Sequence, residues 1–240
     1  MPLSRALLLV CSWLLLGGCV SHTVLTLDER NALERELAAG AKDRYLRMSF
    51  YVTPFFGDAT KRLLAAVPPE EIRMLEYPDG TPVNPGEVQK ILPAGTPVRI
   101  TKVEFPTAWV MAERVLYTPR IQPWIYLEAS GEKGPTPLIL VLRPGIKTQA
   151  EFLSDLERFL SERDPLAAGN FPEPVRAAIR EKKALMDMTA EALEMSWGYP
   201  EKKQVSYEGP SRREDWIYPG GARIAHLIDG RVVALDGGKR

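Results

Sequence analysis

Hydrophobic residues recur at helical spacing in the first part of the chain. The apolar side chains at steps of three or four residues are Leu33, Leu37, Ala41, Tyr45 and Met48. They predict an amphipathic helix that begins at Thr26 or Asp28, either of which can cap it, and that runs to about Met48. Because its charges are mixed, we interpret the stripe as packing on its own domain, with a docking or membrane-surface helix as the alternative.

The densest aromatic cluster of the chain follows this helix. Residues 50–56 read Phe-Tyr-Val-Thr-Pro-Phe-Phe. This cluster is interpreted as packing of the N-terminal segment against the body, and a partner site is the alternative. Asp58 can then cap a short helix that reaches Val67 and is ended by Pro68 and Pro69.

From residue 72 to residue 143 the apolar pattern has the period of strands. Strands are predicted at 72–77, 98–105, 109–116, 124–127 and 138–142, with turn signals such as Pro78-Asp79-Gly80 between them. The apolar phase slips between Ile100 and Val103, which predicts a bulge. Five short strands with loops of this kind predict a small barrel.

The last part of the chain returns to helical spacing. Thr148 and Glu151 form a capping box in front of one helix. The proline-rich stretch that ends at Pro174 is the candidate linker, and a second amphipathic helix begins near Val175. Thr189 caps a third helix, which Gly198 closes.

Strands are predicted after this third helix, at 216–218, 223–228 and 231–235. Asp229-Gly230 supplies the positive φ angles of a two-residue hairpin loop. This loop predicts antiparallel pairing with Ile224 opposite Leu235 and His226 opposite Val233.

Composition restricts the partners of the protein. Lysine and arginine together number 31, as do aspartate and glutamate. This balance gives no global field to attract nucleic acid, so none is expected as a partner. Hydrophobic residues make up 45% of the chain, which is enough to fill a core.

The first residues have the pattern of an export signal. Arg5 is followed by an apolar run from Ala6 to Leu16, which is too short to span a membrane, and then by Gly17-Gly18-Cys19. This resembles the lipobox of bacterial lipoproteins, although an ordinary secretory signal or a buried helix could also contain such a cysteine. The resemblance implies cleavage behind Gly18, loss of Cys11 with the signal, and a lipid on Cys19. No thiol would then remain for catalysis or for a disulfide.

Residues 91–105 contain a strand, a Pro-Ala-Gly-Thr-Pro turn and a second strand. This stretch resembles bacterial Src-homology-3-like barrels, a class of module that often binds cell-wall peptides or proteins. Aromatic side chains could supply a stacking groove or simply fill a small core. The candidate partner-binding residues are Trp109, Trp124 and Tyr126, together with Trp216 in the C-terminal strands.

Residues 175–235 carry a second resemblance. A Met-Thr helix start at 188–189, a Gly-x-Pro helix end at 198–200, a Trp-x-Tyr strand at 216–218 and the final Asp-Gly hairpin are similar to the SmpA/OmlA family of BamE-like outer-membrane lipoproteins. The resemblance implies an α/β layer fold, no catalytic residues, and an accessory role in outer-membrane assembly or envelope integrity.

Catalytic signals are few. The chain has two histidines, His22 and His226, and we interpret His226 as a structural residue of a strand. No HExxH, GxSxG, phosphate-loop or dinucleotide motif is present. We therefore expect no enzyme, no metal site and no small-molecule cofactor. A hydrolase that uses acids not recognisable from sequence is the alternative.

These observations predict an α+β protein. The expected segments are a signal peptide at 1–18, a lipid anchor and helical N-terminal segment at 19–70, a small β-barrel-like domain at 71–145, a helix and linker at 146–170, and a SmpA/OmlA-like helix-helix-antiparallel-meander module at 171–238. We expect a lipid-anchored lipoprotein that faces the periplasm and acts as a non-catalytic adaptor for an envelope protein. Val20 after Cys19 favours the outer membrane by analogy. A peptidoglycan-binding lipoprotein is the main alternative.

Overall fold

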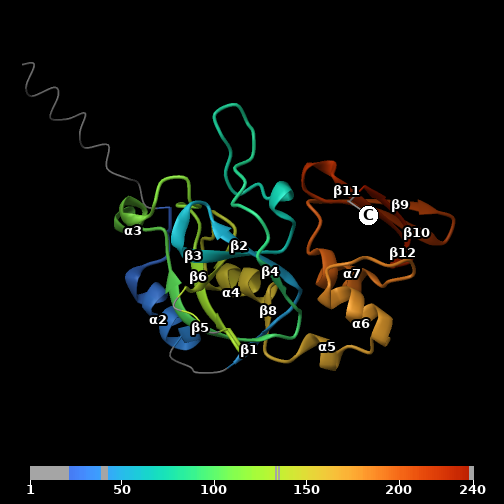
Figure 1. The fold of residues 1–240 in the computed structure, drawn as a ribbon, viewed down its shortest axis with the longest axis horizontal. Helices are drawn as coiled ribbons and strands as arrows, with labels where there is room; N and C mark the ends of the chain where they lie inside the picture. The colour runs from blue at the N-terminus through green and yellow to red at the C-terminus, as the bar shows by residue number, and fades with distance from the viewer. Residues whose placement is uncertain (1–21, 39–42, 133, 135, 238–240) are drawn as a thin grey trace, which may run out of the picture.

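The computed structural model describes residues 22–38, 43–132, 134 and 136–237. Its N-terminal body contains an eight-stranded mixed sheet, and its C-terminal module contains a four-stranded antiparallel sheet (Figure 1). The predicted α+β class is confirmed at this level. Cys19 lies outside the described residues.

The eight strands of the N-terminal body do not close into the predicted barrel. Their order is β4-β2-β3-β7-β6-β5-β1-β8, and in the described chain β4 and β8 are the two ends of the sheet. The strands are β1 Arg44–Leu46, β2 Phe50–Phe55, β3 Asp58–Ala65, β4 Lys90–Leu92, β5 Pro97–Glu104, β6 Trp124–Ala129, β7 Leu138–Val141 and β8 Leu160–Ser161. The hairpin β2–β3 joins β7 in parallel and so extends the sheet sideways instead of letting it close.

Two of the predicted N-terminal helical assignments are wrong. Helix α2 covers only Leu27–Ala38, and Arg44–Leu46 is strand β1, which pairs with β5 and β8. The expected helix after Asp58 is strand β3, because Phe56 and Gly57 both adopt positive φ and form a tight hairpin turn. The aromatic cluster around this turn is buried in the core, as the packing interpretation expected.

Two further strand predictions differ from the structure. Residues 72–77 form a loop with a single bridge between Glu76 and Pro82, and the 3₁₀ turn Pro69–Glu71 precedes it. Residues 109–116 contain helix α3, Ala108–Glu113, because the Thr107 side chain accepts a hydrogen bond from the Val110 N–H and caps it. The predicted bulge in β5 is confirmed, between Ile100 and Lys102.

The large sheet is buried on both faces. Along β7 the side chains alternate between one core, which includes Leu140, and another, which includes Ile139. Helices α2 and α4, Gln149–Glu157, cover the first face, and the loop around Ile72 covers the second. The capping box at Thr148 is confirmed, since its hydroxyl accepts the Glu151 N–H. The short helix α5, Pro165–Ala168, leads to the C-terminal module.

The C-terminal module stacks two helices on a meander. The helices are α6 Glu173–Arg180 and α7 Ala190–Trp197, and the strands are β9 Lys202–Glu208, β10 Ser211–Ile217, β11 Arg223–Ile228 and β12 Arg231–Gly237. The 3₁₀ turn Pro219–Gly221 joins β10 to β11. Thr189 caps α7 as predicted, and Gly198 ends it with a φ of 83°. Trp216, Tyr218 and Leu193 fill the space between the layers.

The predicted register of the last hairpin is wrong beyond its first two pairs. A bulge between His226 and Leu227 adds one residue to β12. The observed pairs are His226 with Ala234 and Ile224 with Asp236, in place of the predicted partners Val233 and Leu235.

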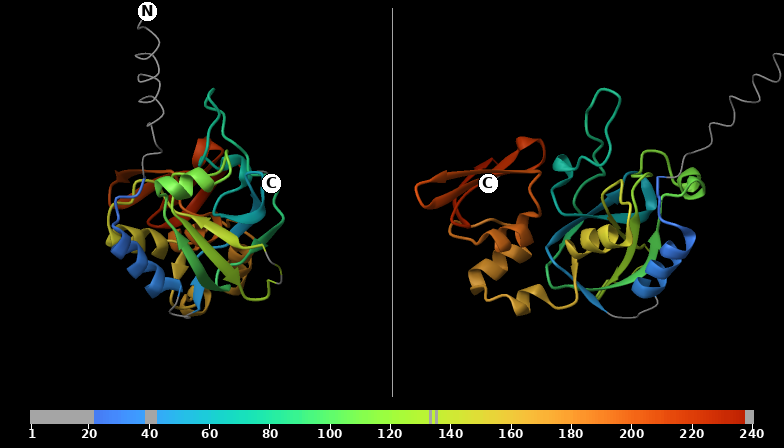
Figure 2. Two further views of the ribbon diagram at one scale, coloured as in Figure 1. Left: turned by 90° about the vertical axis from the view of Figure 1, so that its left-hand side faces the viewer. Right: turned by 180° about the vertical axis from the view of Figure 1, so that it is seen from behind.

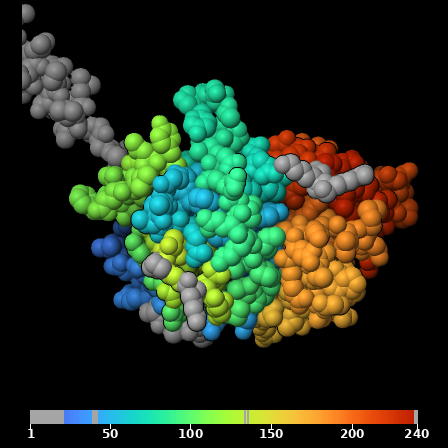
Figure 3. All heavy atoms as spheres, viewed as in Figure 1, coloured from blue at the N-terminus to red at the C-terminus, as the bar shows by residue number. Residues whose placement is uncertain are grey.

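A buried ion pair joins the module to the body. The Arg223 guanidinium in β11 donates two hydrogen bonds, of 2.6 and 2.7 Å, to the carboxylate of Glu71. The guanidinium also lies against the rings of Trp197 and Tyr218, at 4.4 and 4.6 Å from their centroids. In the space-filling view the C-terminal module, in orange and red, adjoins the rest of the described chain (Figure 3).

A buried lysine adds a second joint. The Lys182 Nζ donates to the backbone carbonyls of Ser49, Ala66 and Ser196, at 2.7, 2.9 and 2.6 Å. The first two carbonyls belong to the body and the third to α7, so a single ammonium group links both parts. Burial lowers the pKa of Lys182, and the charge of Arg223 adds to this effect while Glu71 opposes it.

Candidate functional site

The four predicted partner-binding aromatics do not form one site. Trp109 lies on α3 with 72% of its surface exposed, whereas Trp124 in β6 is 1% exposed. Tyr126 is half-buried on the same strand as Trp124. Trp216 lies in β10 of the other module and is 1% exposed. These four residues therefore do not share one stacking surface in the described structure, and Trp109 is the most exposed of them.

A hollow of about 190 Å³ lies between α3 and β6. Trp124 and Tyr126 form one wall, and Asp58 and Lys61 of β3 form another. Asp58 is 2.8 Å from Lys61 and accepts a hydrogen bond from Thr60. The charged groups of this wall are therefore already paired with one another.

Glu104 is the centre of the hollow's polar network. Its carboxylate accepts hydrogen bonds from the Arg114 Nε at 2.9 Å, from the Tyr126 hydroxyl at 3.2 Å and from Lys102 at 2.6 Å. Burial alone would raise the pKa of Glu104, but the hydrogen bond from Lys102 and the charge of Arg114 outweigh burial, so the pKa lies below its usual value. Glu104 is thus an ionised acceptor that fixes its neighbours, and its lowered pKa does not suit proton donation.

Arg114 uses its remaining donors to build the loop after α3. Its Nη1 donates to the carbonyls of Arg120 and Gln122 at 2.6 and 2.8 Å, and its guanidinium stacks at 3.7 Å from the Trp124 ring. The Trp124 Nε1 donates to the Pro119 carbonyl at 2.8 Å. The buried Trp124 therefore supports the loop from beneath, and the hollow serves as a scaffold for the exposed surface above it.

A histidine between two carboxylates lies on the face of the meander that is turned away from α6 and α7. His226 Nδ1 is 2.7 Å from Asp215 Oδ1, and its Nε2 is 3.0 Å from Asp236 Oδ2. The bulge in the last hairpin places Asp236 on this face, because a shift of one residue moves a strand side chain to the other side of the sheet. The three residues can be read in the sequence, but the strand register that brings them together cannot.

We expect His226 to stabilise the fold below neutral pH. Hydrogen bonds to Asp236 and Asp215 raise its pKa above the usual value of 6.5. The contribution is therefore full below pH 6.5 and is lost as the pH rises through the raised pKa. Because the side chain is partly exposed, we expect a loss of less than about 1 kcal/mol. Denaturant unfolding at pH 6 and pH 8.5 measures it.

The matched variants for this effect are Asp236→Asn and Asp215→Asn. Each should lower the His226 pKa in an NMR titration and reduce the difference in stability between the two pH values. A His226 pKa at or below 6.5 in the unaltered protein would contradict the assignment.

Strand β9, which the sequence pattern above did not predict, forms an open edge of the meander. In the described sheet it pairs with β10 alone, through seven consecutive residue pairs without a bulge. Every residue of β9 is exposed, including Val205 and Tyr207. Two signals could have revealed the strand: the alternation of Val205 and Tyr207 with polar residues, and the Gly209-Pro210 turn that follows.

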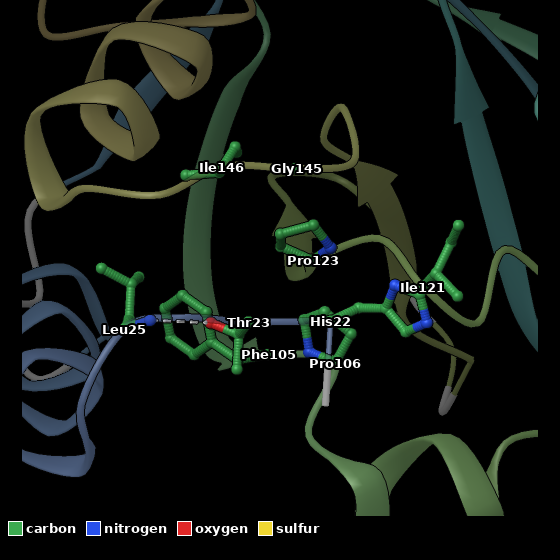
Figure 4. Close-up of a pocket in the computed structure, with 9 residues that line it drawn as sticks. All are labelled: His22, Thr23, Leu25, Phe105, Pro106, Ile121, Pro123, Gly145 and Ile146. Atoms are coloured by element: carbon green, nitrogen blue, oxygen red, sulfur yellow. Dashed lines mark hydrogen bonds between the residues drawn. The ribbon is translucent and has the colours of Figure 1, made fainter. Parts of the chain in front are cut away.

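The first described residues pack against the segment that follows β5 and the segment that precedes β6. His22, Leu25, Phe105 and Ile121 are among the residues around a cavity of about 10 Å³, which is too small for an organic ligand (Figure 4). The His22 N–H donates to the Pro106 carbonyl at 3.0 Å. This contact fixes the start of the described chain two residues before α3.

Comparisons with protein-family models, with curated proteins and with solved structures give no match for this chain. Within the described residues, no helix is long and apolar enough to cross a membrane. The same part of the chain holds no group of three or more histidine, cysteine, aspartate or glutamate side chains arranged to bind a metal.

Proposed function

We propose that this protein is a lipid-anchored envelope lipoprotein that faces the periplasm and acts as a non-catalytic adaptor. The lipobox-like sequence that ends at Cys19 supports the anchor. Two helices followed by an antiparallel meander have the element order implied by the resemblance to SmpA/OmlA proteins, and this supports a role in outer-membrane assembly or envelope integrity.

The open edge of β9 is the observation that carries the adaptor proposal. An exposed strand edge presents unpaired N–H and C=O groups to which an extended peptide can add as a further strand. Strand β9 is regular over seven pairs, whereas the other edge strand, β12, contains a bulge, a feature that disfavours such pairing. We assign β9 as the docking edge.

Two side chains give this edge its apolar contact. Val205 lies opposite the buried Glu214, so it points to the helix side of the sheet, and Tyr207 follows with the same orientation. Tyr207 is 72% exposed, so the described chain leaves most of its side chain uncovered. An extended segment of an envelope protein would pair with the strand and cover both side chains.

The position of the edge also suits an adaptor. The C-terminal module lies at one end of the molecule, and α2 and α3 lie at the other (Figure 2). His22 is tied to the end that carries α3. An anchor at Cys19 would therefore leave β9 directed away from the membrane, while the Lys182 and Arg223 joints keep the two ends in a fixed relation.

Substitution of Tyr207 tests this proposal. Tyr207→Ser should weaken capture of the partner about tenfold, since exposed aromatics at interfaces often contribute more than 1 kcal/mol. It should leave the free energy of unfolding within about 0.5 kcal/mol, because the side chain has few contacts in the free protein. Photo-crosslinking from position 207 in native membranes, followed by identification of the captured protein, provides the measurement.

The matched control is Val233, an exposed apolar residue on the other edge strand. Val233→Ser should leave capture of the partner nearly unchanged. Crosslinking from position 233 should capture little of the partner. Equal capture from both positions would contradict β9 as the docking edge. Co-sedimentation of the native protein with purified peptidoglycan would favour the cell-wall alternative and overturn the pure adaptor.

A further inference from the structure

Helix α3 and the loop after it carry a run of exposed apolar side chains, here called the α3 surface, at the end of the molecule opposite the meander (Figure 1). Its exposed members are Trp109 on α3 and Val115, Leu116, Tyr117 and Ile121 in the loop that follows. Val24 and Leu27, which precede and begin α2, are exposed as well. A soluble protein seldom gathers so many large apolar side chains on one short segment unless they meet a partner or a membrane.

The loop that carries these side chains is held in one shape. Arg114 and Trp124 bond to its carbonyls from below, and Arg120 donates to the Met111 carbonyl. Thr118 donates to the Val115 carbonyl at 2.7 Å. The polar groups named here are thus satisfied within the loop, and the apolar side chains are left to face outward.

Tyr117 adds an unusual backbone feature. Its φ is 62°, in the left-handed region, which glycine and asparagine adopt more readily than tyrosine. An exposed tyrosine therefore occupies a position at which a smaller residue would be less strained. Such a choice is understandable if the ring itself is needed at the surface.

The reach of the anchor identifies what meets this surface. Three residue steps separate Cys19 from His22. A fully extended chain spans at most about 3.6 Å per residue, so Cys19 lies within about 11 Å of His22. The His22 N–H is bonded to the Pro106 carbonyl, two residues before α3. A lipid on Cys19 would therefore hold α3 close to the bilayer surface.

We propose that α3 and the loop to Ile121 lie in the interface of the bilayer that holds the Cys19 lipid. This inference rests on the lipid anchor of the proposed function. Trp and Tyr are the side chains that favour the boundary between headgroups and acyl chains, and Leu116 supplies the apolar insertion next to Tyr117. The surface anchors the protein at a second point and fixes the orientation in which the meander faces away from the membrane.

Tryptophan fluorescence can test this placement directly. Of the four tryptophans in the described chain, Trp109 is exposed, whereas Trp124, Trp197 and Trp216 are buried. We would place the acylated full-length mature protein in vesicles of phosphatidylethanolamine and phosphatidylglycerol with brominated acyl chains. Trp109 should be quenched by the bromine and should become several-fold less accessible to aqueous acrylamide. Trp109→Phe should remove the quenched component.

A double variant tests the loop. Leu116→Ser with Tyr117→Asn should reduce the bromine quenching of Trp109, and the asparagine keeps the left-handed backbone available. Met186→Ser, at an exposed apolar position of the C-terminal module that belongs to neither proposed contact surface, is the control and should leave the quenching unchanged.

The outcomes separate this inference from the anchor on which it rests. Failure of the protein to float with the vesicles would refute the lipid anchor. Flotation with Trp109 still open to acrylamide and unquenched by bromine would refute the membrane-bound loop alone. Protection of Trp109 in native membranes but not in protein-free vesicles would show that a protein covers the surface, and would also overturn the inference.

Discussion

Replacing Glu71 with alanine should destabilise the folded protein by about 3–5 kcal/mol, because the substitution leaves the Arg223 guanidinium buried without its counter-charge. Both side chains of this pair are more than nine-tenths buried. The aromatic rings of Trp197 and Tyr218 hold the guanidinium in place, so it cannot turn to solvent without disturbing the packing of the module. Urea unfolding followed by circular dichroism measures the loss.

Two companion variants make the result specific. Glu128→Ala removes an ion pair with Arg99 in which both side chains are more than half exposed, and it should cost less than about 1 kcal/mol. The double variant Glu71→Leu with Arg223→Met removes both buried charges and should recover most of the stability lost in Glu71→Ala. A cost for Glu71→Ala no greater than that for Glu128→Ala would contradict a buried joint.

Local signals in the sequence were sufficient to predict several parts of the fold. Thr148 and Thr189 cap helices, and Asp229-Gly230 forms the last hairpin loop, as their residue types indicate. The bulge in β5 followed from the slip in its apolar phase. Each of these features depends on a few neighbouring residues, so the sequence alone specifies it.

Features that depend on distant residues could not be predicted in the same way. Tyr45 and Met48 continue the helical spacing of Leu33 and Leu37, yet β1 forms because β5 and β8 offer it partners. Over a short stretch, the same apolar side chains can be buried from a helix or from a strand. Hydrogen bonds to distant segments then decide which of the two forms. The contact between Glu71 and Arg223 spans 152 residues of sequence and leaves no local pattern.

In the candidate site, too, local features could be predicted from the sequence and features that depend on distant residues could not. Trp109 and Trp124 were predicted together as strand aromatics, but Thr107 caps a helix under Trp109 and turns it to the surface. A threonine followed by Ala-Trp-Val-Met-Ala-Glu is a helix start that could have been recognised. The β9 edge could have been found from its alternating residues, whereas the second carboxylate at His226 depends on a bulge that the hairpin loop does not specify.

Trp124→Ala should cost about 3–5 kcal/mol of unfolding free energy, whereas Trp109→Ala should change it by less than about 0.5 kcal/mol. Trp124 is 1% exposed, with Phe55 packed edge-on at 4.8 Å and the Arg114 guanidinium 3.7 Å from the ring centroid. Its removal leaves a cavity and takes away the 2.8 Å hydrogen bond to the Pro119 carbonyl, which keeps only the longer 3.5 Å bond from Arg114 Nη1. Urea unfolding of the two variants side by side gives the comparison.

Variants of the two tryptophans should affect protein stability and membrane contact differently. Trp109→Ala should keep the fold and weaken only the contact of the α3 surface with the bilayer, because nothing in the core depends on its ring. Trp124→Ala should impair both, since Trp124 and Arg114 hold the loop that carries Leu116 and Tyr117. Trp124→Phe keeps the ring against Phe55 but loses the hydrogen bond to Pro119, so it should recover most of the stability and less of the membrane contact. Equal losses of stability in Trp109→Ala and Trp124→Ala would show that α3 packs into the core and would remove the distinction.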